Sequence, residues 1–401
     1  MKKVNFSVIL FGGLVIASNS YASPVNVTYD EGTVFEVAES GFKNKLNVGL
    51  KTGYNYTKLN LRSGSDPDAS SFDVGLARIQ LGGEASSGVV GYQVQGDFAQ
   101  AGINADNEFK LSNAYVFWKP SDWIKIKLGQ MKQGFPAQFM VDDFSSQFYV
   151  RDSLATQYYN LGRNQGAVLG IHDPDEVFWL KLGVFNGESV FSFADGGYGE
   201  GQNHPGVDTD HRFVLAGRYN ILGNVDWKSE SDYGISEDLN WSVTAAYSFA
   251  TNNYSIVDPV SNITLETDID FQDVALGTQV RASGVSFNGE VFWRDWDPDG
   301  GEGDDGWGYY AQLGGFVSSD VELFGRFSGV DCKAISFTSA ANYCTWSNDD
   351  DVFEYSAGAS YHLGSKYHRV GLEYSFIDLG NDSGRQANDD QRLSVFLSTF
   401  F

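Results

Sequence analysis

The last nine residues of the chain, 393–401, constrain its fold more than any other segment. Extended as a strand, they would present five side chains to one side, namely Leu393, Val395, Leu397, Thr399 and Phe401. The opposite side would be mixed, with Ser394, Phe396, Ser398 and Phe400. One face can therefore contact lipid while the other contacts a mixed interior. The segment predicts the closing strand of a transmembrane β-barrel.

The amino-terminal residues have the layout of a secretory signal peptide. Lys2 and Lys3 supply positive charge, residues 6–17 form an apolar run, and Ser20-Tyr21-Ala22 is a small-x-small cleavage site. The run is too short to cross about 30 Å of hydrocarbon as a helix. We expect residues 1–22 to be removed and residues 23–401 to form a single β-barrel domain.

Alternation with a period of two predicts an all-β fold, a transmembrane antiparallel barrel of about sixteen strands. The composition agrees, with 46 Gly and only 8 Pro, because Pro interrupts inter-strand ladders. The predicted strands lie near residues 45–59, 71–84, 90–99, 110–119, 123–130, 167–172, 177–186, 211–221, 241–251, 269–282, 285–295, 307–317, 321–328, 352–363, 367–377 and 391–401.

The connections between these strands alternate between long and short, as they do in outer-membrane barrels with long external loops and short periplasmic turns. Residues 131–163 form the longest connection, the third external loop, which we expect to fold inward and narrow the barrel. Residues 222–240 break the rule, because a periplasmic turn at this place should be short. A barrel of sixteen strands leaves an aqueous lumen, so the sequence predicts a pore.

Acidic residues outnumber basic ones by 52 to 27, which gives a formal charge of −25 and argues against nucleic acid as a partner. Many lie in predicted loops, where they are either solvated tips or sites at which divalent cations bridge them to one another or to lipopolysaccharide. Asp295, Asp297 and Asp299 resemble the start of a calcium loop, but its twelfth position is Gly306. We predict no metal ligands and no cofactor.

Basic residues that alternate with apolar neighbours are candidates for the lumen. Lys125 and Lys127 lie opposite Ile124, Ile126 and Leu128, and the same pattern places Arg78, Lys181, Arg212, Arg218, Arg294 and Arg326 inward. The long third loop adds Lys132, Arg151 and Arg163. Rings of Arg and Lys select anions. The alternative is that these residues only pair with inward Asp97, Asp273, Glu290, Glu322, Glu354 and Glu373.

Cys332 and Cys344 lie in a polar stretch of the sequence. After export to an oxidising compartment, we expect them to form one local disulfide. A zinc site is disfavoured, because neither a CxxC motif nor a nearby His supplies further ligands.

The stretch of residues 78–187 resembles the phosphate-selective porin O and P family. The matching pieces, in order, are Ala77-Arg78-Ile79-Gln80-Leu81-Gly82, Tyr92-Gln93-Val94-Gln95-Gly96-Asp97-Phe98-Ala99, Ala114-Tyr115-Val116, Ile126-Lys127-Leu128-Gly129-Gln130-Met131-Lys132, Arg163-Asn164-Gln165-Gly166 and Gly183-Val184-Phe185-Asn186-Gly187. The resemblance implies a sixteen-stranded, trimeric channel of the bacterial outer membrane, in contact with lipid and lipopolysaccharide, whose constriction loop carries basic residues that draw phosphate or polyphosphate. Lys127, Lys132 and Arg151 lie in the matching segments. Family members often have Arg-Asp where this chain has Arg163-Asn164, so the preferred solute stays open.

The function we expect is passive diffusion of small hydrophilic solutes and ions, with anion or phosphate preference and a general or cation-preferring pore as the two alternatives. A closed structural barrel is disfavoured by small or polar interior positions such as Asn47, Gly49, Gln93 and Gln95. A barrel enzyme is the alternative from another class. Its nucleophile and base are not apparent, since the five His residues are scattered and no GxSxG motif accompanies them. We therefore predict no enzymatic activity.

Overall fold

The computed structural model describes residues 25–29, 32–37, 42–59, 68–85, 87–100, 110–186, 211–257, 264–299, 303–331, 351–378 and 390–401. The expected signal peptide, residues 1–22, and both Cys332 and Cys344 lie outside the described residues. Those two predictions stay untested.

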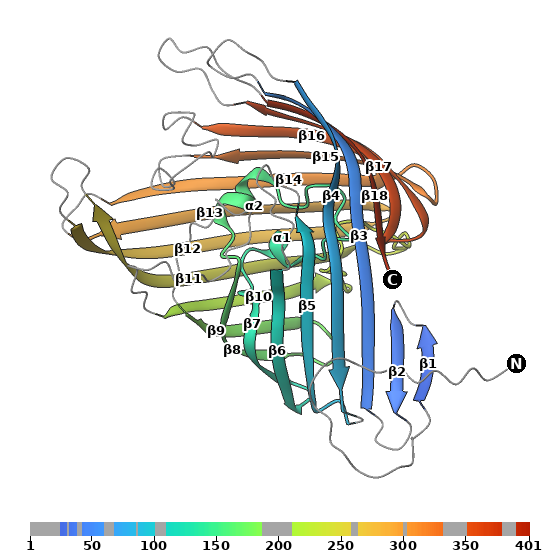
Figure 1. The fold of residues 1–401 in the computed structure, drawn as a ribbon, viewed down its shortest axis with the longest axis horizontal. Helices are drawn as coiled ribbons and strands as arrows, with labels where there is room; N and C mark the ends of the chain where they lie inside the picture. The colour runs from blue at the N-terminus through green and yellow to red at the C-terminus, as the bar shows by residue number, and fades with distance from the viewer. Residues whose placement is uncertain are drawn as a thin grey trace, which may run out of the picture.

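Sixteen antiparallel strands of the described chain form a closed barrel (Figure 1). Each strand pairs with the next in sequence, and β18 pairs with β3 to complete the ring, so the sixteen-strand prediction is confirmed. The strands are β3 (Phe42–Leu59), β4 (Asp68–Glu84), β5 (Val90–Gln100), β6 (Lys110–Ser121), β7 (Ile124–Lys132), β8 (Arg163–His172), β9 (Phe178–Phe185), β10 (Arg212–Leu222), β11 (Asn240–Val257), β12 (Thr264–Ala282), β13 (Val285–Pro298), β14 (Asp304–Phe316), β15 (Val321–Val330), β16 (Val352–Ser365), β17 (His368–Asp378) and β18 (Asp390–Phe400).

A short hairpin that the sequence analysis missed precedes the barrel. It consists of β1 (Val25–Tyr29) and β2 (Thr33–Val37), and β2 pairs with the first residues of β3, from Phe42 to Leu46. β18 pairs with β3 only from Gly49 onward. The hairpin therefore extends the sheet beyond the end of the closing strand, beside the lower end of β3 in Figure 1.

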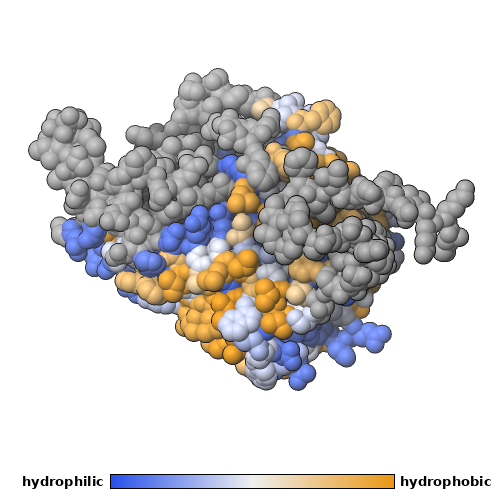
Figure 2. All heavy atoms as spheres, turned by 60° about the horizontal axis from the view of Figure 1, so that its bottom comes forward, coloured by the Kyte–Doolittle hydropathy of each residue, from blue (hydrophilic) through white to orange (hydrophobic). Residues whose placement is uncertain are grey.

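The two faces of the wall differ as the period-two pattern predicts. In β18, Leu393, Val395 and Leu397 are exposed, whereas Ser394 and Ser398 are completely buried. Exposed apolar residues gather over the outer face, as Figure 2 shows. Because a bilayer solvates apolar side chains and not polar ones, this face suits contact with lipid.

The described helices are both short, and neither is long and apolar enough to cross a membrane. They are α1 (Ala137–Met140) and α2 (Leu154–Tyr159), both in the connection between β7 and β8.

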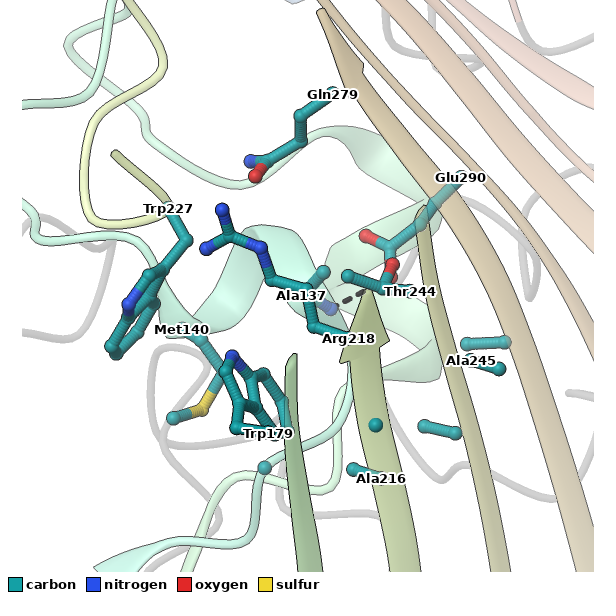
Figure 3. A pocket seen from close by; sticks show the side chains of 14 residues that line it. Ala137, Met140, Trp179, Ala216, Arg218, Trp227, Thr244, Ala245, Gln279 and Glu290 are labelled. Atoms are coloured by element: carbon teal, nitrogen blue, oxygen red, sulfur yellow. Dashed lines mark hydrogen bonds between the residues drawn. The ribbon is translucent and has the colours of Figure 1, made fainter. Parts of the chain in front are cut away.

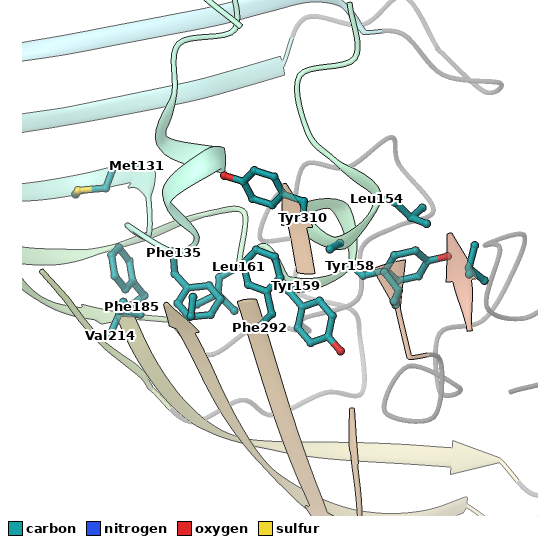
Figure 4. Packing of buried hydrophobic residues seen from close by; sticks show 14 of the residues in the cluster. Met131, Phe135, Leu154, Tyr158, Tyr159, Leu161, Phe185, Val214, Phe292 and Tyr310 are labelled. Carbon is teal, nitrogen blue, oxygen red and sulfur yellow. The ribbon is translucent and has the colours of Figure 1, made fainter. Parts of the chain in front are cut away.

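This connection, residues 133–162, packs on the buried face of the wall. Phe135, Leu154 and Tyr159 of the connection form one cluster with wall residues such as Phe292 and Tyr310 (Figure 4). The rings of Tyr159 and Phe292 stack with their centroids 5.4 Å apart. Apolar contacts therefore hold α2 of the connection against the wall.

Wall carboxylates also hold the backbone of residues 133–162. Glu290 accepts hydrogen bonds from the N–H groups of Ala137 and Gln138 at 2.7 and 3.0 Å. Further along, Leu154 N–H donates to Glu354 at 2.7 Å and Tyr149 N–H donates to Glu373 at 2.6 Å. A largely irregular segment cannot satisfy its own buried N–H groups, so these carboxylates replace the missing backbone partners.

The anomalously long connection between β10 and β11, which we call the strap (residues 223–239), reaches several distant parts of the wall. Ser229 O accepts from Arg281 of β12 at 2.8 Å, and Asp226 forms an ion pair with Lys366, just beyond β16, at 2.7 Å. The strap also meets residues 133–162, since Asp142 N–H donates to Lys228 O at 3.0 Å. Its length is explained by these contacts, because a tight turn could not reach them.

We predict that Glu290→Ala destabilises the barrel and loosens residues 133–162. Figure 3 shows the Glu290 carboxylate at the start of α1, where its removal leaves two buried N–H groups without their acceptor. Each lost acceptor costs about 1–3 kcal/mol. The measurements are the unfolding temperature in detergent and the rate of protease cleavage within residues 133–162.

The matched control is Glu84→Ala. Glu84 is half-exposed and lies 3.7 Å from Lys119, an arrangement worth about 0–1 kcal/mol. Equal unfolding temperatures for the two variants would contradict the role given to Glu290.

Candidate functional site

A cavity of about 890 Å³ lies between one side of the wall, residues 133–162 and the strap. Of the eleven basic residues predicted for the lumen and the long third loop, seven border it, namely Arg78, Lys125, Lys127, Lys132, Arg163, Lys181 and Arg218. Arg151 forms an ion pair with Asp143, which borders the cavity, whereas Arg212, Arg294 and Arg326 do not border it. The structure therefore brings most of the predicted residues together.

The charge of this cavity is opposite to that of the chain. Nine basic and five acidic side chains line it, an excess of four positive charges in a chain of formal charge −25. The basic residues are Arg78, Lys119, Lys125, Lys127, Lys132, Arg163, Lys181, Arg218 and Lys228. The acidic residues are Asp122, Asp142, Asp143, Asp173 and Glu176. The local field in the cavity therefore favours anions.

Among the basic residues, the arginines near α1 are neutralised. Arg78 forms ion pairs with Asp97 and Asp143, each at 2.7 Å, and Arg151 pairs with Asp143 and Asp152. The same pairing occurs elsewhere on the wall, where Asp273 binds both Arg212 and Arg294 and Glu354 binds Arg326. The carboxylates Asp97, Asp273 and Glu354 are among those that the alternative named, whereas Arg151 pairs with Asp143 and Asp152 of its own segment.

Asp143 is shared by two guanidinium groups and stays ionised. Burial alone would raise its pKa, but Arg151 and Arg78, with Lys132 nearby, hold the pKa of Asp143 well below its usual range. Asp143 therefore contributes a fixed negative charge that offsets part of the positive cluster.

Two further basic residues position residues 133–162. The Lys132 ammonium donates to the carbonyls of Phe139 and Val141 and lies 4.8 Å from the centre of the Phe139 ring. Arg163 lies over the same ring from 5.7 Å, and its Nε donates to Asn113. Both cations therefore have protein partners.

Four other lysines of the cavity face aromatic rings, and we call Lys125, Lys127, Lys181 and Lys228 the lysine cluster. The Lys125 ammonium lies 4.3 Å from the centre of the Phe117 ring, and that of Lys127 lies 4.6 Å from the Tyr115 ring. Within the described residues, no ion pair is formed by any member of the cluster. These ammonium groups are the ones available to a mobile anion.

Strand register explains how the cluster forms. Lys125 and Lys127 share one face of β7, and Gly170 of β8 lies opposite Lys125 on one side and opposite Lys181 of β9 on the other. Lys125 and Lys181 therefore lie in one row, two strands or about 10 Å apart. A Cβ at Gly170 would meet His172 Nε2 at 2.6 Å, so the absence of a side chain at Gly170 leaves room for the His172 ring.

The strap supplies site residues that the sequence analysis missed, Trp227 and Lys228. The Lys181 ammonium lies 4.2 Å from the Trp179 ring and 5.5 Å from the Trp227 ring, and Lys228 also lies 5.5 Å from Trp227. The sequence held one signal that could have pointed to them: the connection is unexpectedly long, and it contains an aromatic residue next to a lysine.

A closed sixteen-stranded barrel with an apolar outer face and a charged, polar inner lining is the architecture of an outer-membrane porin. The chain belongs to the phosphate-selective porin O and P family, whose model matches residues 46–324. The family prediction is confirmed over a longer stretch than the residues that suggested it. The protein is a channel of the bacterial outer membrane.

Solved structures with the same fold include an anion-selective porin from Comamonas acidovorans, with a TM-score of 0.58 and 13% identity over 90% of this chain and 100% of that one. Outer-membrane expressed OmpT of Vibrio cholerae has a TM-score of 0.56 and 12% identity over 90% and 98% of the two chains. The trimer form of in-vitro folded OmpT has a TM-score of 0.52 and 12% identity over 89% and 99%. No curated protein matches the sequence.

The prediction that the chain has no enzymatic activity needs correction. The neighbours in fold include OmpT, which is described as an outer-membrane protein and not as a channel. A shared barrel at 12% identity does not separate channels from catalysts. The statement that this chain is not an enzyme therefore does not stand.

We predict that Asp143→Asn lowers the unfolding temperature and raises the chloride-to-potassium permeability ratio. The substitution leaves Arg78 and Arg151 without their shared counter-charge, and breaking a buried ion pair costs about 3–5 kcal/mol. The control is Asp238→Asn, in an exposed part of the strap away from the cavity. Asp238→Asn should leave both quantities unchanged.

The pH dependence of this difference follows from the lowered pKa of Asp143. Its stabilising contribution is complete above the unfolded pKa of about 3.9 and is lost only as the pH falls through the lower folded value. The chloride-to-potassium permeability ratios of the wild type and of Asp143→Asn should therefore differ by the same amount from pH 7 down to about pH 4. Convergence of the two proteins near pH 6 would refute the assignment.

Proposed function

We propose that this porin prefers anions, and that the lysine cluster provides the preference. The observation that carries the proposal is the excess of positive charge around the cavity, together with four lysines for which the described residues provide no carboxylate partner. An ammonium group held against an aromatic ring keeps its charge exposed on its other side, so a passing anion can replace part of its lost hydration there.

The proposal includes the position of residues 133–162 in the lumen, where they would narrow the channel. The support is their set of contacts with the buried face of β13, β16 and β17, through Glu290, Glu354 and Glu373. In this arrangement, Arg78, Lys132, Arg151 and Arg163 shape the narrow part, and Lys125, Lys127 and Lys181 line the route of the anion.

A general or cation-preferring pore is the competing function. The formal charge of −25 favours it, because acidic residues outnumber basic ones almost two to one over the whole chain. The measurement that separates the two is the zero-current potential of the purified protein in a planar bilayer under a KCl gradient. Chloride preference supports the proposal, and potassium preference refutes it.

We predict that Lys127→Glu shifts the permeability ratio toward potassium. The substitution reverses one charge in the cavity, two residues along β7 from Lys125, and changes the local excess of positive charge by two. Lys43→Glu is the control, because Lys43 is more than half exposed and lies outside the cavity. An unchanged ratio in Lys127→Glu would exclude Lys127 from the conducting path.

The state and surroundings of the porin form the last part of the proposal. We infer that the chain is exported and cleaved after Ala22. Its apolar outer face would then contact lipid and lipopolysaccharide. We also infer that the porin assembles as a homotrimer. The trimer form of OmpT, which shares this fold, supports the assembly. We expect the mass of the detergent-solubilised complex to be three times that of residues 23–401, and a monomer mass would contradict it.

A further inference from the structure

The lysine cluster is accompanied by two indole rings from separate elements. Trp179 belongs to β9 and Trp227 to the strap, and both rings border the cavity. Their centroids lie 6.5 Å apart with an interplanar angle of 58°. The Lys181 ammonium lies near both rings. A positive charge and two aromatic surfaces thus meet at one point of the cavity.

An inorganic anion makes little use of this arrangement. Phosphate binds best to the planar fork of arginine and to backbone N–H groups, but the arginines of this cavity already have protein partners: Arg78 is paired with carboxylates, and Arg163 and Arg218 donate to amide and carbonyl oxygens. The aromatic rings offer a small inorganic ion no compensating contact. They do offer contact to an apolar, planar group, because aromatic pairs gain energy beyond the burial of their area.

The cavity has the size of a site for a small organic molecule. Its volume of about 890 Å³ lies in the range of such sites, which are mostly apolar and carry a few polar groups that fix orientation. Trp179, Trp227, Tyr115 and Phe178 supply the apolar lining, and the lysine cluster supplies the polar groups.

Contacts on both sides of Trp227 hold this residue of the strap in a fixed place. On one side of Trp227, Asp226 binds Lys366 at 2.7 Å, and on the other side, the backbone of Lys228 accepts from Asp142 at 3.0 Å. Arg281 also donates to Ser229 O at 2.8 Å. The position of Trp227 is therefore set before any solute arrives, which reduces the entropy lost on binding.

We propose that the cavity is a binding site for aromatic carboxylates on the permeation route. The carboxylate would lie between the ammonium groups of Lys181 and Lys127, and the aromatic ring would pack against Trp227 and Trp179. The inference rests on the proposed anion preference of the channel and adds the class of solute that the channel takes.

The test compares how three anions block the conductance of the wild-type protein in a planar bilayer. The probes are benzoate, cyclohexanecarboxylate and inorganic phosphate, where the first two have the same charge and similar size but only benzoate is planar and aromatic. We expect a half-blocking concentration for benzoate that is roughly two- to tenfold lower than for cyclohexanecarboxylate, from the energy of one aromatic contact. Phosphate should block less than benzoate.

Two variants assign the effect to the site. Trp227→Leu should abolish the difference between benzoate and cyclohexanecarboxylate, whereas Trp118→Leu, on the exposed face of β6 and outside the cavity, should preserve it. Lys181→Met should raise the half-blocking concentrations of both carboxylates alike. This second variant keeps the test decisive if Trp227→Leu does not fold.

The outcomes separate this inference from the proposed function. Equal block by both carboxylates, stronger block by phosphate, or a full benzoate preference in Trp227→Leu would overturn the aromatic site. A chloride preference measured in the same KCl gradient would leave the anion-preferring function intact. Potassium preference would overturn both proposals.

Discussion

Closure of the backbone hydrogen-bond ring is the constraint on which the rest of this structure depends. Within hydrocarbon, an open sheet edge would leave a row of N–H and C=O groups without partners, so the wall must return to its first strand. Val48 and Phe401 exchange two hydrogen bonds of 2.8 Å beside the last β18–β3 pair. Once the ring is closed, one strand face meets lipid, and every charged side chain of the spanning strands must be accommodated on the other.

The buried charges are sorted by the chemistry of their head groups. Arginine can bind a carboxylate and a carbonyl at once, and Arg326 does so with Glu354 and the carbonyls of Val150 and Arg151. Such residues tie residues 133–162 to the wall. Lysine carries a compact charge, and Lys125 and Lys127 each lie against one ring, while Lys181 lies near two. Apart from Lys51 and Lys132, which donate to carbonyls of the segment, the cations that hold residues 133–162 in the described chain are arginines, and the proposed attraction of anions belongs to lysines.

The periodicity of the sequence is sufficient for the wall and insufficient for the cavity. Alternation predicts which face each residue of β18 or β7 occupies, because a strand has a fixed period of two. It does not give the register that places Lys125 and Lys181 in one row across Gly170, since that depends on pairing between strands. The hairpin of β1 and β2, the two short helices and the role of Trp227 were also missed. Their short segments lack a distinctive period and are fixed by tertiary contacts.

The meeting of residues 133–162 with the strap has a consequence for the shape of the permeation route. The two segments leave the barrel at opposite rims, because one follows β7 and the other follows β10 in an antiparallel ring. They join through Asp142, Gln147 and Glu230, so a continuous column of chain links the rims. With this column in the lumen, as proposed, the channel is eccentric rather than axial. Under that proposal, a permeating anion travels along the quadrant formed by β7 to β9, and the opposite quadrant serves as scaffold.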